Sequence, residues 1–328
     1  DGGNATRLAL RYADAFPLAY RNAGPAEAAR DIRVLRTLSG SNAPRRAVRL
    51  HRNMGEVALR LKLYQREGAI ILSDAVPVLE NFGFRVLEEV PTPLDGGRLG
   101  FVHDFLVAHP ADSSVEELLG RADAIETSLA AVLNGVAEDD AFNRLIVATG
   151  LSAQEANWLR AFYRYLRQAS MTFGIHTVVE ALKNAPEVTR NLIAAFVARH
   201  DPGFAEDREA AFTRAEDRIR AGLAGVAAIN DDRLLRQFHA LVIAILRTNA
   251  FAPAAAEALA FKIDSALVPG LPKPVPWREI SVYSPRVEGI HLRAGPVARG
   301  GLRWSDRRDD FRTEILGLMK AQRVKNAV

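Results

Sequence analysis

Two arginines and two glycines near the carboxy-terminal end of the sequence could bind a carboxylate. In the run Arg299-Gly300-Gly301-Leu302-Arg303, the glycine pair permits a tight turn and a close approach of the backbone to a ligand. Each guanidinium offers a planar fork of donors that matches a carboxylate, and such charge-assisted bonds are roughly twice as strong as neutral ones. We therefore predict that Arg299 and Arg303 bind a dicarboxylic molecule, while an exposed hairpin is the plainer interpretation of an Arg-Gly-Gly turn.

A second pair of candidates lies in the last segment of the chain. Gln322 and Lys325 are three residues apart in a stretch with helical spacing, so they share a helix face with Leu318. A lysine among apolar neighbours can supply a point charge for a carboxylate, although a solvated surface lysine is the usual case. A short turn and a terminal helix are thus the elements that must position this chemistry.

The first third of the chain is predicted to form a small α/β sandwich after two helices. The predicted elements are two helices within 5–38, a loop at 39–44, a solvated basic run at 45–52, strands at 57–64, 85–90 and 99–108, a helix that Ser73 caps, and a turn at 95–97. The order strand, helix, hairpin is that of an ACT-like regulatory module, and other ferredoxin-like halves share it. His103 and Asp104 could contact an effector from an edge strand, and an exposed strand pair is the plainer interpretation.

The middle of the chain, from residue 110 to about 267, has helical spacing, with Ser113 or Ser114 as a cap and a break at 201–203. Arg160, Arg164 and Arg167 share one helix face, which could bind phosphate. We favour the other interpretation, an aromatic core face whose charged side is solvated or paired with a neighbour.

Prolines dominate residues 268–276, which we predict to be a linker because proline interrupts helices and disfavours strand pairing. Short strands at 280–283 and 289–292 and a helix from Phe311 are expected after it. The predicted fold class is α+β. Its predicted domains are N-terminal helices at 1–50, an ACT-like domain at 51–112, a helical domain at 113–267, the proline-rich linker at 268–276, and the first strands and helix of an α/β catalytic domain at 277–328.

Composition narrows the classes of function. The chain has no cysteine, so it offers neither disulfides nor a thiolate, and this fits a cytoplasmic protein. Its net charge of +4, from 43 basic and 39 acidic residues, does not indicate nucleic acid, and no apolar run predicts a membrane span. The seven histidines lack metal-ligand spacing, so we assign no metal, and no G-x-G-x-x-G motif occurs. Since the chain opens at Asp1 rather than methionine and stops within an expected helix, we expect an internal piece of a longer protein.

The carboxy-terminal run carries a specific resemblance. Tyr-Ser-Pro-Arg-Val-Glu-Gly-Ile-His-Leu-Arg from Tyr283, followed by Ala-Arg-Gly-Gly-Leu-Arg-Trp-Ser-Asp-Arg-Arg, closely resembles the large bacterial NAD-specific glutamate dehydrogenases, and the segments around Leu61, 101–105 and 142–145 are similar to that family as well. The resemblance implies an oligomeric enzyme of amino-acid catabolism that converts L-glutamate to 2-oxoglutarate and ammonium, with hydride passing to NAD.

The same resemblance suggests roles for individual residues. In the smaller glutamate dehydrogenases, a lysine that contacts a substrate carboxylate stands where this sequence has Arg299, which keeps the charge and changes the geometry. Gln322 and Lys325 match the glutamine and lysine that hold the substrate α-carboxylate. The catalytic lysine is expected just after Val328 and the NAD-binding domain further on, so the chain alone should be inactive. The alternative is that the ACT-like region acts as a module that senses an amino acid or builds an oligomer.

Overall fold

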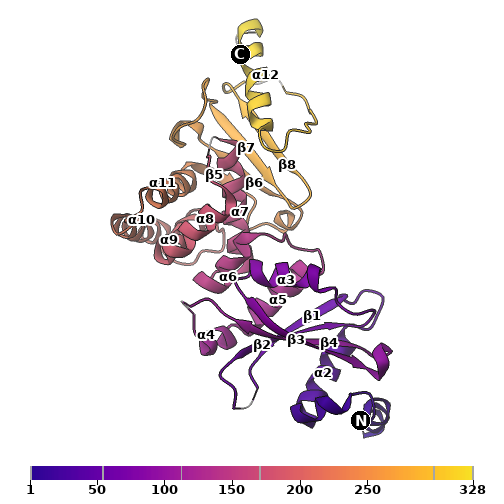
Figure 1. The fold of residues 1–328 in the computed structure, drawn as a ribbon. Helices are drawn as coiled ribbons and strands as arrows, with labels where there is room; N and C mark the ends of the chain where they lie inside the picture. The colour runs from indigo at the N-terminus through magenta and orange to yellow at the C-terminus, as the bar shows by residue number, and fades with distance from the viewer. Residues whose placement is uncertain (1, 54, 112, 170, 298–299, 327–328) are drawn as a thin grey trace. The chain divides into compact units, whose positions relative to one another are not determined.

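The computed structural model describes residues 2–53, 55–111, 113–169, 171–297 and 300–326. The chain divides into two compact units, unit 1 at residues 1–153 and unit 2 at residues 154–328 (Figure 1). Each unit contains a four-stranded sheet in which all the described strand pairs are antiparallel.

The sheet of unit 1 has the spatial order β1-β2-β4-β3. Its strands are β1 (Arg46–His51), β2 (Leu59–Gln65), β3 (Arg85–Leu94) and β4 (Gly100–Ala108). Side chains alternate between the two faces of a strand, so Leu61 and Leu63 lie on one face and Lys62 and Tyr64 on the other. All four are at most 1% exposed, which means that both faces of this sheet are covered.

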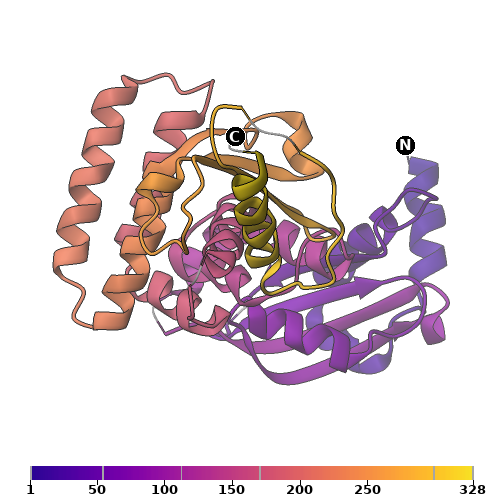
Figure 2. The same ribbon diagram turned by 90° about the horizontal axis from the view of Figure 1, so that it is seen from above.

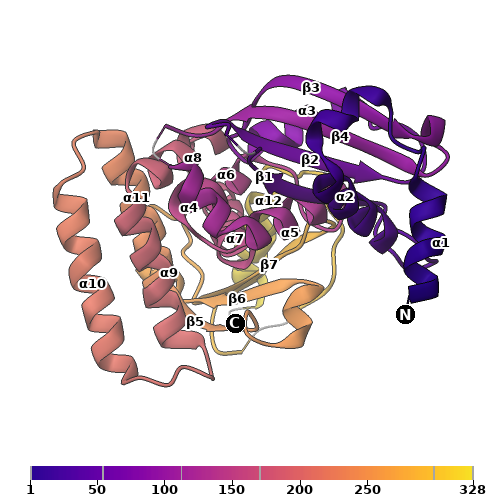
Figure 3. The ribbon, with the colours of Figure 1, turned by 90° about the horizontal axis from the view of Figure 1, so that it is seen from below.

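Helices cover both faces of this sheet. As Figures 1 and 3 show, one face carries α3 (Leu72–Asn81) and α5 (Ala122–Leu133), and the other carries α2 (Pro25–Thr37). The remaining helical segments of unit 1 are α1 (Gly2–Tyr12), η1 (Leu18–Ala23), η2 (Asp95–Gly97), α4 (Val115–Gly120), η3 (Ala141–Asn143) and α6 (Arg144–Thr149). Leu35 of α2 packs with Tyr64 and Val102 in a core that α1 also joins. The α+β class and the ACT-like order of elements are confirmed.

Three predictions about secondary-structure elements of unit 1 were wrong. The basic run at 45–52 contains strand β1 rather than a solvated segment, because Val48 and Leu50 alternate with the arginines and are buried. Ser73 does not cap α3, since Ile71 holds the N-cap position and makes no side-chain cap bond. Strand β3 continues through Pro91 and Pro93 to Leu94, which is compatible with its place at the sheet edge, where a proline need not donate to a neighbour.

The predicted turn between β3 and β4 is confirmed, and it requires glycine. Gly97 has a φ of 93°, a region that side-chain-bearing residues rarely adopt. A Cβ atom at this position would lie 2.5 Å from Cζ of Phe101. The hairpin register of β3 and β4 therefore depends on the absence of a side chain at residue 97.

The helices of unit 2 surround an aromatic core. They are α7 (Ala153–Gln168), α8 (Ile175–Asn184), α9 (Pro186–His200), α10 (Arg208–Ala224) and α11 (Ile229–Ala244), with short turns η4 (Pro253–Ala256) and η5 (Ser265–Leu267). The predicted break at 201–203 is confirmed, because it separates α9 from α10, which run side by side in Figure 3. Ring centroids of Phe162 and Phe196 lie 5.4 Å apart, and Phe162 also packs edge-on against Phe261 at 5.2 Å.

The sheet of unit 2 corrects the prediction of continuous helix up to residue 267. Strands β5 (Ile245–Thr248) and β6 (Leu259–Ile263) fall within that stretch, and β7 (Arg278–Tyr283) and β8 (Glu288–Arg293) follow the prolines. The order is β5-β6-β7-β8, so β6 pairs with β7 across the proline-rich segment 268–276. That segment therefore joins two neighbouring strands of one sheet, rather than separating two folded parts as predicted.

The predicted terminal helix is present as α12 (Phe311–Asn326). In Figure 2 it lies in yellow beside the orange strands of its sheet, and Leu316 and Met319 pack against Leu292 of β8. Among the residues that the structure describes, no helix is both long enough and apolar enough to cross a membrane.

Candidate functional site

Arg303, a predicted carboxylate ligand, lies beside the first turn of α12. Its Nε donates to Oε1 of Glu314 at 2.8 Å, and Ser305 Oγ donates to Oε2 of the same carboxylate at 2.7 Å. The Ser305 hydroxyl, together with the charge of Arg303, holds the pKa of Glu314 below its usual value. In this structure, Arg303 is therefore paired with a carboxylate of the chain itself, while its side chain is 55% exposed.

The other predicted ligands fall outside the part that the structure describes in full. Arg299 lies outside the described residues. Gln322 and Lys325 belong to α12, but their side chains lie outside the described ones. Helical spacing puts positions 322 and 325 on the stripe of Leu318, which is 40% exposed, whereas Leu316 is 6% exposed and buried against β8. Of the four predicted ligands, Arg303 is therefore the one whose side-chain contact with α12 is described.

A buried ion pair that the sequence reasoning missed fixes the beginning of α12. Glu279 of β7 and Arg312 are both 0% exposed, and they form a two-pronged bond. Arg312 Nε donates to Oε2 at 2.9 Å, and Nη2 donates to Oε1 at 2.6 Å. Alternation gave no signal for this pair, because Glu279 shares the buried side of the strand Arg278–Tyr283 with Ser281 and Tyr283, whereas the apolar Ile280 and Val282 lie on the other side.

Two side chains of α7 complete this cluster. Gln168 accepts from the backbone N–H of Arg312 at 3.0 Å and donates through Nε2 to the carbonyl oxygen of Arg308 at 2.8 Å. Tyr165 donates its hydroxyl to Oε2 of Glu279 at 3.3 Å. Burial, and then the adjacent Glu279 carboxylate, raises the pKa of Tyr165, so the phenol stays protonated as a donor. We call Glu279, Arg312, Gln168 and Tyr165 the buried anchor.

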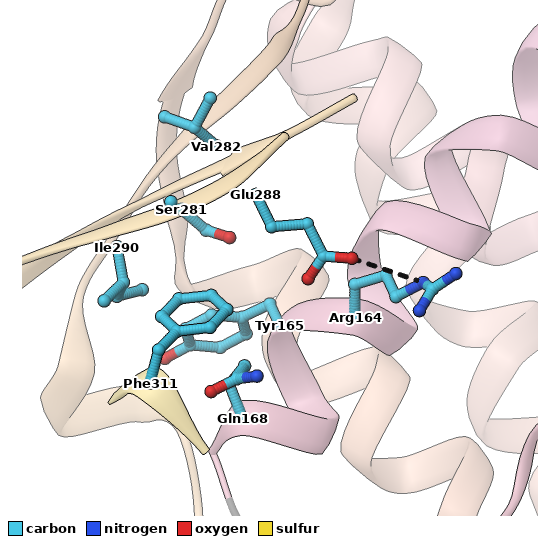
Figure 4. Close-up of a pocket in the computed structure, with 9 residues that line it drawn as sticks. Arg164, Tyr165, Gln168, Ser281, Val282, Glu288, Ile290 and Phe311 are labelled. Carbon is cyan, nitrogen blue, oxygen red and sulfur yellow. Dashed lines mark ion pairs between the residues drawn. The ribbon is translucent and has the colours of Figure 1, made fainter. Parts of the chain in front are cut away.

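A small pocket borders the buried anchor (Figure 4). It encloses about 210 Å³, part of it open to solvent, and its lining residues are Arg164, Tyr165, Gln168, Ser281, Val282, Glu288, Gly289, Ile290 and Phe311. Arg164 Nε and Glu288 Oε1 face each other at 3.6 Å, the ion pair that is dashed in Figure 4. Ligand sites usually enclose on the order of 300–1,000 Å³, so this pocket is small for a ligand site.

The arginine stripe of α7 is paired along its length, which favours the structural interpretation over phosphate binding. The partners are Asn157 for Arg160 at 2.8 Å, Glu288 for Arg164 at 3.6 Å and Asp309 for Arg167 at 2.6 Å. Trp158, Phe162, Tyr163 and Tyr165 of the same helix are each at most 3% exposed and form the predicted core face.

His103 of unit 1 does not stand on an edge strand as predicted, because β4 lies between β2 and β3. It is 3% exposed, and its Nδ1 lies 2.7 Å from Oε1 of Glu89. Its Nε2 accepts from the backbone N–H of Ile70 at 3.2 Å, so both ring nitrogens have a partner within the chain. Asp104 accepts from Arg60 at 3.0 Å. His103 is thus a satisfied interior residue and not a surface contact for an effector.

A second buried ion pair joins α2 to the sheet of unit 1. Lys62 is 1% exposed and Asp31 is 0% exposed, and Lys62 Nζ donates to Asp31 Oδ2 at 2.8 Å and to Glu27 Oε1 at 2.7 Å. Tyr64 donates to Asp31 Oδ1 at 2.7 Å, and Tyr20 also donates to this carboxylate. Burial raises the pKa of Asp31 and lowers the pKa of Lys62, although their attraction opposes both shifts.

The described residues do not provide a site for a metal or a dinucleotide. No group of three or more histidine, aspartate or glutamate side chains within them could hold a metal ion. Dinucleotide-binding folds use a parallel sheet with a glycine-rich turn, whereas both described sheets are antiparallel. The part of the chain that the structure describes therefore does not have a dinucleotide-binding fold.

Four glutamate dehydrogenase family models match the chain in order. They are "Glutamate dehydrogenase, helical motif 2" at residues 1–38, "Glutamate dehydrogenase, ACT3 domain" at 45–118, "Glutamate dehydrogenase, helical motif 3" at 137–202, and "Bacterial NAD-glutamate dehydrogenase, catalytic domain" at 218–328. The last of these contains β5 to β8, α12 and two members of the buried anchor, Glu279 and Arg312.

Curated relatives match almost the whole chain. The NAD-specific glutamate dehydrogenase of Halomonas elongata is 42% identical over 333 residues, which cover 99% of this chain and 20% of that protein. The proteins of the same name from Pseudomonas aeruginosa and Mycobacterium tuberculosis are 39% and 41% identical, and each match covers 98% of this chain and 20% of the relative. The chain thus spans about a fifth of the length of these relatives. It belongs to the bacterial NAD-specific glutamate dehydrogenase family, as a segment with the ACT3 domain, helical motifs and the start of the catalytic domain.

Proposed function

We propose that this chain is the part of a longer NAD-dependent glutamate dehydrogenase that leads from the ACT-like module into the catalytic domain. The complete protein would convert L-glutamate, NAD⁺ and water to 2-oxoglutarate, ammonium, NADH and a proton. The observation that carries the proposal is the match of the catalytic-domain family model to residues 218–328, the region in which the buried anchor holds α12.

The substrate-binding role of this chain would lie in its cationic and amide groups. We propose that Gln322 and Lys325 bind the α-carboxylate of glutamate and that Arg299 and Arg303 contribute to binding its carboxylates. The described structure gives only Nε of Arg303 a partner, Glu314, so the two terminal nitrogens are the part proposed for the substrate. These residues would bind and orient glutamate; the acceptor of hydride is outside this chain.

Because the antiparallel sheets provide no dinucleotide site, we expect the chain alone to be inactive. The test is to mix glutamate and NAD⁺ with this chain and, separately, with the full-length protein, and to follow NADH absorbance. Glutamate-dependent NADH should form only with the full-length protein. A full-length protein that binds NAD⁺ but does not oxidise glutamate would refute the proposal.

The second candidate is that the ACT-like region senses an amino acid or builds an oligomer, and the ACT3 match favours it. Strand addition at either sheet edge is the less favourable route to an oligomer. At β1, the backbone N–H groups of Arg46 and Leu50 donate to side chains of α5 and its end, Asn134 and Glu126, and the β3 edge carries prolines. We therefore propose that an oligomer of the complete protein uses other surfaces.

The sensing version has a direct test on this chain. Thermal unfolding is measured with each amino acid of a panel, and a ligand that binds the folded unit raises its midpoint in a concentration-dependent way. A flat response across the panel would remove this candidate.

A further inference from the structure

We propose that the buried anchor is a positioning device that sets the place of α12, and with it the substrate-binding positions 322 and 325. This inference rests on the proposed function, since it assumes that glutamate binds to that helix. Glu279 and Arg312 would act through Gln322 and Lys325 without touching the substrate themselves. Gln168 of α7 would fix the start of α12 through its bonds to Arg308 and Arg312.

The first argument is that the ion pair is a costly way to obtain stability. Both side chains are fully buried, and Nη1 of Arg312 has no hydrogen-bond partner among the described residues. Removing two charges from water costs several kcal/mol per ion, and replacing such a pair by packed apolar residues is often neutral or stabilising by about 1–4 kcal/mol. What the pair offers beyond an apolar contact is direction, because a two-pronged bond fixes the orientation of both groups.

The second argument is that the contacts described between α12 and β8 are apolar. Its apolar cluster contains Leu316 and Met319 against Leu292, with Ile290, Ala294 and Ile315 partly buried around it. Apolar side chains of this kind tolerate small shifts and rotations at little cost, because their contacts have no direction. The buried anchor adds four directional bonds at the start of the helix.

The third argument is the distance along α12 between the buried anchor and the substrate-binding positions. Gln322 and Lys325 follow Arg312 by 10 and 13 residues, which at the rise of an α-helix corresponds to about 15 Å and about 20 Å. A tilt of the helix by about 10° around Arg312 would move position 325 by roughly 3 Å. A misplacement of about 1 Å can cost on the order of 10²-fold in rate. A small tilt at the start of the helix would therefore misplace the substrate-binding positions enough to slow the reaction.

The experiment uses the full-length protein and separates positioning from stability. Glu279→Gln leaves the buried guanidinium with a neutral partner, whereas the double variant Glu279→Leu with Arg312→Met fills the same space without charge. Gln168→Met removes the bonds to Arg308 and to Arg312 without adding or removing charge, so it remains informative if the charged variants fail to fold. Glu187→Gln is the matched control, because Glu187 forms an exposed pair with Arg190 on α9 at 2.5 Å.

We expect the double variant to melt near the wild-type temperature, while its KM for glutamate rises by about tenfold or more and its KM for NAD⁺ stays unchanged. Gln168→Met should raise the KM for glutamate in the same selective way, and Glu187→Gln should leave both constants unchanged. Wild-type KM for glutamate in the double variant, or in Gln168→Met, would overturn the inference. A wild-type protein without glutamate-dependent NADH formation would instead refute the proposed function.

Discussion

Replacing Lys62 by methionine should destabilise unit 1 strongly and leave unit 2 unchanged. Methionine keeps most of the length of the lysine side chain and removes the ammonium group. The substitution takes away the bonds from Nζ to Asp31 at 2.8 Å and to Glu27 at 2.7 Å, in a place where the lysine is only 1% exposed. The carboxylate of Asp31 is then buried without its nearest cation.

The magnitude follows from the partners that remain. Breaking a buried ion pair by removing one side typically costs about 3–5 kcal/mol. Asp31 would still accept from Tyr64 at 2.7 Å and from Tyr20, and Nη2 of Arg49 would remain 3.5 Å from it, so we expect a loss at the low end, about 3 kcal/mol. For a folded unit of this size, that corresponds to a drop of roughly 6–12 °C in the melting temperature.

The chain contains an internal control for the assay. Its three tryptophans, at positions 158, 277 and 304, all lie in unit 2, so tryptophan fluorescence follows that unit during urea unfolding. Hydrogen exchange of the backbone amides of β2 follows unit 1. Lys62→Met should speed exchange in β2 at an unchanged fluorescence midpoint, whereas Arg98→Met, which removes a 79% exposed partner of Asp95, should change neither.

The variant should also acquire a pH dependence with a defined sign. Burial already raises the pKa of Asp31, and loss of the lysine charge should raise it further. A carboxyl whose pKa is higher in the folded state contributes stability at low pH and loses it as pH rises through that value. The deficit of Lys62→Met relative to wild type should therefore shrink as pH falls. An equal deficit at all pH values, or β2 exchange like that of wild type, would refute the reasoning.

Three further predictions concern local geometry and titration. Gly97→Ala should destabilise unit 1 by about 1–3 kcal/mol, seen as faster amide exchange in β3 and β4, because a Cβ would meet the ring of Phe101 at a strained φ of 93°. Ser114→Ala should cost about 1 kcal/mol in the same assay, since its hydroxyl accepts from the backbone N–H three residues on, at 3.2 Å, and caps α4. Burial, and then two neighbouring arginines, lowers the pKa of His200 to about 4. Unit 2 should therefore lose about 1–2 kcal/mol of stability as pH falls from about 6.5 toward 4, a figure reduced for solvent screening because the ring is only partly buried. Urea midpoints measured by tryptophan fluorescence should fall over this pH range, and they should fall less in His200→Gln.

Local sequence patterns predicted the elements that carry their own signals. The alternation in β2, the turn at 95–97 and the spacing of α12 each follow from residues that are close in the chain. Strands β1, β5 and β6 were missed because their identity depends on partners elsewhere: the arginines of β1 look solvated until β2 and α5 are placed beside them. A four-residue strand such as β5 has too little sequence to show a period.

The residues of the candidate site likewise fall into those that local sequence predicts and those that depend on distant partners. The Arg-Gly-Gly turn and the Gln322 and Lys325 pair could be found from residue types and spacing. The bond between Glu279 and Arg312 joins residues 33 apart, and neither carries a local sign of its partner. In the sequence, Glu279 alternates with the apolar Ile280 and Val282, so the pattern alone does not predict that this carboxylate is buried and needs a partner.

The two buried ion pairs attach a helix to a sheet with different chemistry, and the difference bears on their roles. In unit 1 the ammonium group of Lys62 is a point charge shared among Asp31, Glu27 and Tyr20, so small shifts of α2 can be followed by exchange among several acceptors. In unit 2 the planar fork of Arg312 meets both oxygens of one carboxylate, so a rotation of α12 breaks at least one of the two bonds. The lysine pair therefore holds α2 against its sheet while permitting small shifts of the helix, and the arginine pair holds α12 in one orientation. Strict orientation is what a helix needs if residues 10 and 13 positions further along are to meet one small dicarboxylate.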